Sequence, residues 1–237
     1  IQGDLLMNRI SLYTLLILIF LGLSKSFAPS EHKTPKIDNA LVFPNYFLGS
    51  PLSSILVDAF QTGFLIKTYF LKFKQVGFGG SRTVIIRTSK SFWNESTQYM
   101  GMSLFRRNQR DGSTSAVPMP PGSIYIGNAA YGIWEYKDSG ERAWKFFNAY
   151  RSFPQIFGWD NWSPSFAFYE KLKIHRHNET PFLGLKKEFG IDGIISKKSY
   201  PDFFKEEPVF NFNFKKNFSK LVWFPGWKAK PLLKRAR

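Results

Sequence analysis

The chain contains the run Arg82-Thr83-Val84-Ile85-Ile86-Arg87-Thr88, directly after the glycine cluster Gly77-Phe78-Gly79-Gly80-Ser81. Branched side chains fit the surface of a pleated sheet, and glycine clusters commonly form turns. We therefore predict a turn over residues 77–81 and a β-strand over residues 82–88. The cluster does not have the features of a phosphate-binding loop, because no helix opening with Lys-Ser or Lys-Thr follows it.

Further short strands are expected on the C-terminal side of this run. The segments 99–106, 123–126 and 131–136 are rich in apolar and aromatic residues, and loops containing glycine or proline separate them. Asp138-Ser139-Gly140 is a turn signal after the last of these segments. Several short strands joined by turns predict a small antiparallel sheet.

Two later segments have the spacing of amphipathic helices. In residues 141–153, large side chains recur every three or four positions, and the segment stops before Pro154. A second helix is expected to begin with Ser163 as N-cap and Pro164 at the first position, and to end near Asn178.

The segment before the glycine cluster allows two interpretations. Residues 53–60 could form a helix capped by Ser53 or Ser54, and residues 65–73 could form a second helix or a pair of strands. Periodicity does not separate these cases. The chain as a whole predicts an α+β fold, namely a single mixed domain with a small antiparallel sheet and two or more packed helices.

The composition indicates a folded protein and excludes several kinds of site. Of the 237 residues, 43% are hydrophobic and 21% are charged, which is typical of a folded chain. The absence of cysteine excludes disulfides, thiolate metal sites and cysteine nucleophiles. His175 and His177 would point in different directions on a helix, so we predict no metal site, and no motif calls for a cofactor.

The N-terminus has the layout of a secretory signal peptide. Met7 is the expected start, Arg9 supplies a basic residue, and the apolar run over residues 10–23 is shorter than the roughly 20 residues that cross a bilayer. An uncleaved anchor is the alternative. We divide the chain into upstream residues plus signal peptide over 1–28, a polar tether over 29–39, one domain over 40–227 and a basic tail over 228–237.

Export combined with a lack of cysteine indicates a compartment. Exported proteins of higher organisms commonly rely on disulfides, because their surroundings are oxidising. An exported chain of this size without cysteine is more typical of a bacterial envelope. We therefore expect a protein of the bacterial periplasm or cell surface.

Glu135 and Glu141 are the best-placed carboxylates for acid–base chemistry, because they flank the predicted turn at residues 138–140. Aromatic neighbours could raise the pKa of a carboxyl group by excluding water, and could stack on sugar rings. The pattern predicts a lysozyme-like peptidoglycan hydrolase in which one glutamate is the general acid. The expected substrate-binding residues are Trp134, Tyr136, Trp144, Arg151, Trp159 and Trp162.

The net charge supports a second hypothesis. The chain carries 33 Lys and Arg against 17 Asp and Glu, a formal charge of +16, which attracts polyanions. The alternative to a hydrolase is thus a non-catalytic binder of anionic envelope polymer or of a membrane surface, through basic and aromatic faces. Nucleic acid is not an expected partner, because it is scarce outside the cytoplasm.

Overall fold

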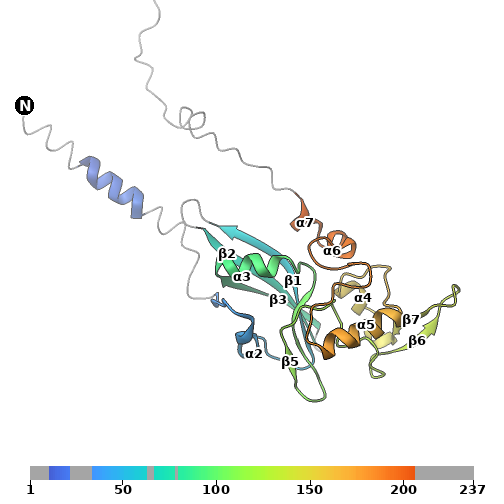
Figure 1. The fold of residues 1–237 in the computed structure, drawn as a ribbon. Coiled ribbons are helices and arrows are strands. Elements are labelled where there is room, and N and C mark those ends of the chain that lie inside the picture. Colours follow the sequence, from blue (N-terminus) through green and yellow to red (C-terminus); the bar gives the residue numbers. More distant parts are fainter. Residues whose placement is uncertain (1–10, 22–33, 63–66, 78–79, 206–237) are drawn as a thin grey trace, which may run out of the picture. The chain divides into compact units, whose positions relative to one another are not determined.

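The structure is a computed structural model, and it describes residues 11–21, 34–62, 67–77 and 80–205 (Figure 1). Residues 11–21 form a helix within the expected signal peptide. The predicted basic tail over residues 228–237 lies outside the described residues. In the ranges that are described, no helix has the length and hydropathy needed to span a membrane.

A five-stranded antiparallel sheet forms the first half of the fold (Figure 1). Its strands, in their spatial order, are β3 (Gly80–Thr88), β2 (Thr68–Gly77), β1 (Leu52–Thr62), β4 (Ser103–Arg107) and β5 (Thr114–Ser115). The strand predicted over residues 82–88 lies within β3 and is confirmed. The strand predicted over residues 99–106 is confirmed only in its second half, as β4.

Strands β2 and β3 form a hairpin, with one strand on each side of the predicted glycine turn. Their pairing runs without a break from Tyr69 opposite Thr88 to Gly77 opposite Gly80. Residues 78–79, at the tip of the hairpin, lie outside the described residues. From Thr68 onward the 65–73 segment is neither the helix nor the pair of strands that the sequence allowed, but part of the single strand β2.

The helix expected over residues 53–60 is wrong, because these residues belong to β1. This strand is central in the sheet and pairs with β2 on one side and β4 on the other. Residues 52–56 are buried without interruption. A strand that is covered on both faces loses the alternation of apolar and polar residues, so its sequence cannot be distinguished from a buried helix.

A separate hairpin forms the second sheet. It consists of β6 (Gly132–Tyr136) and β7 (Arg142–Phe146), which pair antiparallel with Trp134 opposite Trp144. The strand predicted over residues 131–136 is confirmed, and so is the turn after it, where the Gly140 N–H donates to the Lys137 carbonyl at 2.8 Å.

The amphipathic helix predicted over residues 141–153 is wrong. Its first part is β7, in which Trp144 and Phe146 are buried while Lys145 between them is exposed. This is the two-residue period of a strand, and pairing with β6 satisfies its backbone groups. The remainder forms a short 3-10 helix, η2 (Asn148–Tyr150), and the beginning of α4 (Phe153–Ile156).

The strand predicted over residues 123–126 is also wrong. Residues 121–127 form consecutive turns, in which the Tyr125 N–H donates to the Gly122 carbonyl at 2.9 Å. Residues 123–126 are all buried. The apolar run therefore marks a buried segment correctly, although its backbone is not extended.

The second predicted helix is confirmed as α5 (Phe166–His177), but it begins two residues late. Ser165 is the N-cap, and its hydroxyl accepts from the Phe168 N–H at 3.2 Å. Residues before it pair with β7: the Pro164 carbonyl accepts from the Trp144 N–H at 2.9 Å. This pairing keeps Ser163 and Pro164 out of the helix.

The remaining helices are short. They are η1 (Ala40–Val42), α2 (Phe43–Tyr46), α3 (Lys90–Thr97), α6 (Ile194–Ser199) and α7 (Pro201–Phe204). One continuous core, rich in aromatic side chains, runs from Phe43 and Phe73 beside the five-stranded sheet to Phe157 and Trp159 near the second hairpin. The predicted fold class, a mixed α+β domain with an antiparallel sheet and packed helices, is confirmed.

Candidate functional site

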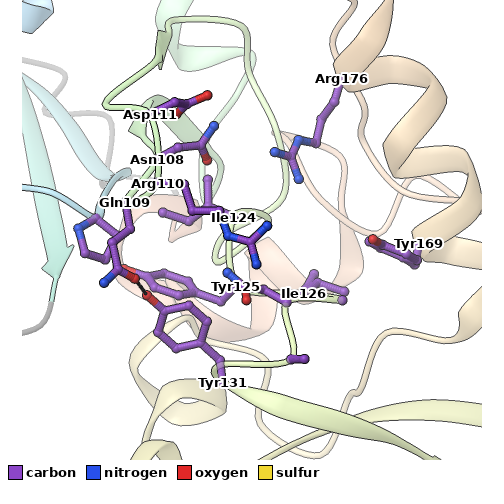
Figure 2. Close-up of a pocket in the computed structure, with 14 residues that line it drawn as sticks. Asn108, Gln109, Arg110, Asp111, Ile124, Tyr125, Ile126, Tyr131, Tyr169 and Arg176 are labelled. Carbon is purple, nitrogen blue, oxygen red and sulfur yellow. Dashed lines mark hydrogen bonds between the residues drawn. The ribbon is translucent and has the colours of Figure 1, made fainter.

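A cleft of about 390 Å³ lies where three segments meet: the loop after β4, the consecutive turns over residues 121–127, and helix α5 (Figure 2). Its charged lining residues are Arg110, Asp111 and Arg176. Tyrosine rings and asparagine and glutamine amides supply much of the rest of the lining. We call this site the arginine cleft.

Helix α5 contributes Tyr169 and Arg176 to the arginine cleft. They are seven positions apart, which is close to two helical turns, so both project from the same face of the helix. In Figure 2 both side chains extend from α5 toward the opposite loop and turns. The Ser165 cap and the buried Phe168 and Leu172 fix the helix that carries them.

A glycine allows α5 to approach the turns closely. Gly127 lines the cleft and has a φ of +75°, a conformation that side chains with a Cβ rarely adopt. A Cβ atom at this position would lie 2.3 Å from the Tyr169 ring. The Tyr169 ring can therefore pack against the turn only because residue 127 has no side chain.

Two tyrosines form an ordered wall of the cleft. The Tyr131 hydroxyl donates to the Gln109 side-chain oxygen at 2.6 Å, the dashed contact in Figure 2. The ring of Tyr131 meets that of the buried Tyr125 edge-on, with 4.9 Å between centroids. The Tyr125 hydroxyl in turn donates to the Val76 carbonyl at 3.3 Å, which links the wall to β2.

The loop after β4 is held by its own polar contacts. The Asn108 amide donates to the Ser113 hydroxyl at 2.8 Å, and the Asp111 carboxylate accepts from the Ser113 N–H and hydroxyl at 3.0 and 2.8 Å. These hydrogen bonds lower the pKa of Asp111, and the charge of Arg176 adds a smaller effect. The acidic group of the cleft is thus largely engaged within its own loop.

The two arginines of the cleft are not neutralised in this way. Among the described residues, neither Arg110 nor Arg176 forms an ion pair with a carboxylate. Arg176 is half-buried, and burial lowers the pKa of its guanidinium, while the nearby Tyr169 and Asp111 offset part of this effect. The cleft therefore presents positive charge and hydrogen-bond donors to whatever enters it.

Comparisons with known proteins gave no relative for this chain: no family model, no curated protein and no solved structure matches it.

The two glutamates predicted as general acids lie on the second hairpin. Glu135, on β6, accepts from the Lys145 ammonium group at 3.1 and 2.9 Å through its two carboxylate oxygens. Glu141 is exposed in the turn before β7, with its backbone carbonyl bonded to the Lys137 N–H. Neither glutamate lines the arginine cleft.

The predicted sugar-stacking aromatics occupy different environments. Trp144 and Trp159 are 4% and 2% exposed and pack within the core. Trp162 is half-buried between Trp159 and Phe168. Tyr136 and Arg151 are exposed.

Trp134 is the predicted aromatic residue that approaches the arginine cleft. It is half-buried, and its ring lies 5.1 Å from those of Trp144 and Phe166 and 5.4 Å from that of Tyr169. Since Tyr169 lines the cleft, Trp134 supports the cleft wall from behind.

The sequence contained weak signals for the residues of the cleft. Tyr169 was expected on a helix, and Arg176 stands between His175 and His177 at the end of that helix. Their seven-residue spacing placed them on one face, but no local pattern indicated that the loop of Arg110 would lie opposite. His175 bonds the Thr180 hydroxyl at 2.9 Å, and no cluster of three potential metal ligands occurs among the described residues.

Proposed function

We propose that this protein is a non-catalytic binder of an anionic envelope polymer, and that the arginine cleft holds a negatively charged group of that polymer. The observation that carries the proposal is the presence of Arg110 and Arg176 in one cleft without a paired carboxylate in the described part of the chain. Arg110 is exposed, whereas Arg176 is half-buried, and a half-buried charge is ordinarily paired, so an external anion is the natural partner of Arg176.

The chemistry of the cleft suits this ligand class. A guanidinium group binds phosphate or carboxylate oxygens through two parallel N–H donors, and such charge-assisted bonds are stronger where water is partly excluded. The Asn108 and Asn128 amides add neutral donors. The Tyr169 ring offers an aromatic surface on which the repeating unit of a polymer can lie.

The compartment determines which polyanion is proposed. The signal-like N-terminus supports export, and the absence of cysteine supports a bacterial periplasm or cell surface. In that compartment, the anionic polymers and glycans of the wall are the available partners. The net charge of +16 supports long-range attraction to them.

Hydrolysis of wall glycan by Glu135 or Glu141 is the competing proposal. It is supported by the position of Glu135 next to Trp134, whose ring approaches Tyr169 at the edge of the cleft. It is weakened by the contact of both Glu135 oxygens with Lys145, because a general acid must direct a proton at the leaving group. We therefore favour the binder.

A sedimentation assay separates these proposals. The purified protein is incubated with cell-wall sacculi, either intact or stripped of their anionic polymers, and both pellet and supernatant are analysed. The binder proposal expects protein in the pellet of intact sacculi, much less in that of stripped sacculi, and no soluble sugar fragments. Fragments that disappear with Glu135→Gln or Glu141→Gln would establish the hydrolase, and protein that stays in solution with both preparations would contradict both proposals.

A further inference from the structure

Arg106 is a buried charged residue that the proposed function does not use. It lies on β4, is 5% exposed, and donates from one terminal nitrogen to the Ser115 hydroxyl at 2.9 Å and to the Val117 carbonyl at 3.1 Å. Its Nε atom is buried without a hydrogen-bond partner, and no carboxylate among the described residues pairs with it. The hydrogen-bond partners of this guanidinium within the described part of the chain are neutral.

The environment of Arg106 is costly for a positive charge. Burial, and to a lesser extent the neighbouring charge of Arg176, lowers the pKa of the Arg106 guanidinium to about 9. The group consequently remains protonated at neutral pH. A protonated, desolvated arginine that faces a second arginine lacks the counter-ion that usually stabilises such a group.

A second cavity of about 190 Å³ adjoins these two arginines. It shares Arg176 and Asn108 with the arginine cleft, so the two spaces meet at Arg176. Donor groups dominate its polar lining, and Glu179 is its one carboxylate. Its polar lining residues are Arg106, Asn108, Ser113, Thr114, Ser115, Arg176 and Glu179.

We infer that this second cavity binds one phosphate group, anchored by Arg106 and Arg176. The inference rests on the proposed function and deepens it, because it names phosphate as the charged group that the polymer supplies. A phosphate presents several oxygens in a tetrahedral arrangement, which can accept from both guanidinium groups and from the Ser115 hydroxyl together, while the Ser113 hydroxyl already donates to Asp111. A planar carboxylate has two oxygens and satisfies fewer of these donors.

Calorimetric titration of the full chain with inorganic phosphate tests the inference. Phosphate is expected to bind the wild type more tightly than acetate does, and Arg106→Gln is expected to weaken phosphate binding at least about tenfold. Equal affinity for acetate and phosphate would overturn the assignment, and so would a folded Arg106→Gln variant with wild-type affinity. Methyl phosphate and dimethyl phosphate then distinguish a polymer end, which is a monoester, from the diesters within a chain.

Glu179→Gln keeps the test decisive if Arg106→Gln does not fold. Glu179 is exposed, and its replacement removes the single negative charge of the lining. Phosphate affinity should therefore increase several-fold, and an unchanged affinity would overturn the inference. The sedimentation assay distinguishes failure of this inference from failure of the proposed function. Binding to sacculi without binding of phosphate would contradict only the phosphate assignment. Absence of both would contradict the binder proposal as well.

Discussion

Tyr125 connects the wall of the arginine cleft to the sheet. Its ionisation is also expected to lower the stability of the fold at alkaline pH. Burial raises the pKa of Tyr125 well above its ordinary value of about 10, and the nearby Tyr131 and Tyr150 add to the effect. Below about pH 10 both the folded and the unfolded chain keep this proton, so Tyr125 ionisation does not alter stability there. Above that pH only the unfolded chain loses it, and the free energy of unfolding falls by up to about 1.4 kcal/mol per pH unit.

We therefore expect Tyr125→Phe to move the midpoint of alkaline unfolding to higher pH. At neutral pH the free energy of unfolding of the same variant should be lower by up to about 1 kcal/mol, because the hydrogen bond to the Val76 carbonyl is removed. Circular dichroism between pH 8 and pH 12 measures the alkaline midpoint, and urea unfolding at pH 7 measures the loss of stability at neutral pH. Tyr136→Phe is the matched control, since this side chain is 75% exposed, and an equal shift in the two variants would refute the role of burial.

At the scale of single elements, α5 matters most because it carries both Tyr169 and Arg176. Its N-terminal backbone N–H groups depend on the Ser165 hydroxyl, which accepts from the Phe168 N–H. Ser165→Ala should lower the free energy of unfolding by about 1 kcal/mol, and should lower Tm by roughly 2–4 °C for a chain of this size. Thermal unfolding, monitored by circular dichroism, measures the change in Tm.

The control for the cap is Ser163→Ala, at the position where the sequence pattern placed the N-cap. Residues 163 and 164 lie before the helix, and Ser165 has an extended backbone and forms a bridge with Ala143 of β7. Ser163→Ala should therefore change Tm by less than about 1 °C. A larger loss from Ser163→Ala than from Ser165→Ala would mean that the helix begins earlier than described.

Elements were predictable from the sequence where their own residues determine them. The β-branched run over residues 82–88 and the capped segment that becomes α5 carry local signals. The strand formed as expected, and the helix formed two residues later than predicted, with Ser165 as its N-cap. Residues 141–153 did not form the predicted helix, because β7 makes its backbone hydrogen bonds with β6 on the other side of a turn. The local sequence of this segment does not indicate that pairing. The helix expected over residues 53–60 was wrong for a different reason: residues 52–56 of β1 are buried in succession, so the alternation of apolar and polar residues that marks a strand is absent there.

The arginine cleft was less predictable than the fold. Arg110 and Arg176 come from the loop after β4 and from the end of α5, which are far apart in the sequence, and only tertiary packing brings them to one cleft. The aromatic residues that suggested a sugar site were conspicuous because they are large. Trp144 and Trp159 are in fact largely enclosed by the core.

At the scale of the whole molecule, the net charge and the cleft make separate contributions to binding. A charge of +16 attracts any polyanion at long range, and salt screens this attraction over about 8 Å at physiological ionic strength. A contact with the half-buried Arg176 is screened less, because water is partly excluded from it. Binding through the cleft should thus depend on which positive charge is removed, and not only on how many.

The most direct measurement compares two variants of α5 that each remove one positive charge. Arg176→Gln changes the arginine cleft, whereas Lys171→Gln changes an exposed residue of the same helix that is not part of the cleft lining. The apparent Kd for intact sacculi is measured for both at about 0.15 M salt, near physiological ionic strength. We predict a rise of about tenfold or more for Arg176→Gln and of less than about twofold for Lys171→Gln. Equal rises would show that net charge alone drives binding, and would contradict the assignment of the cleft as the binding site.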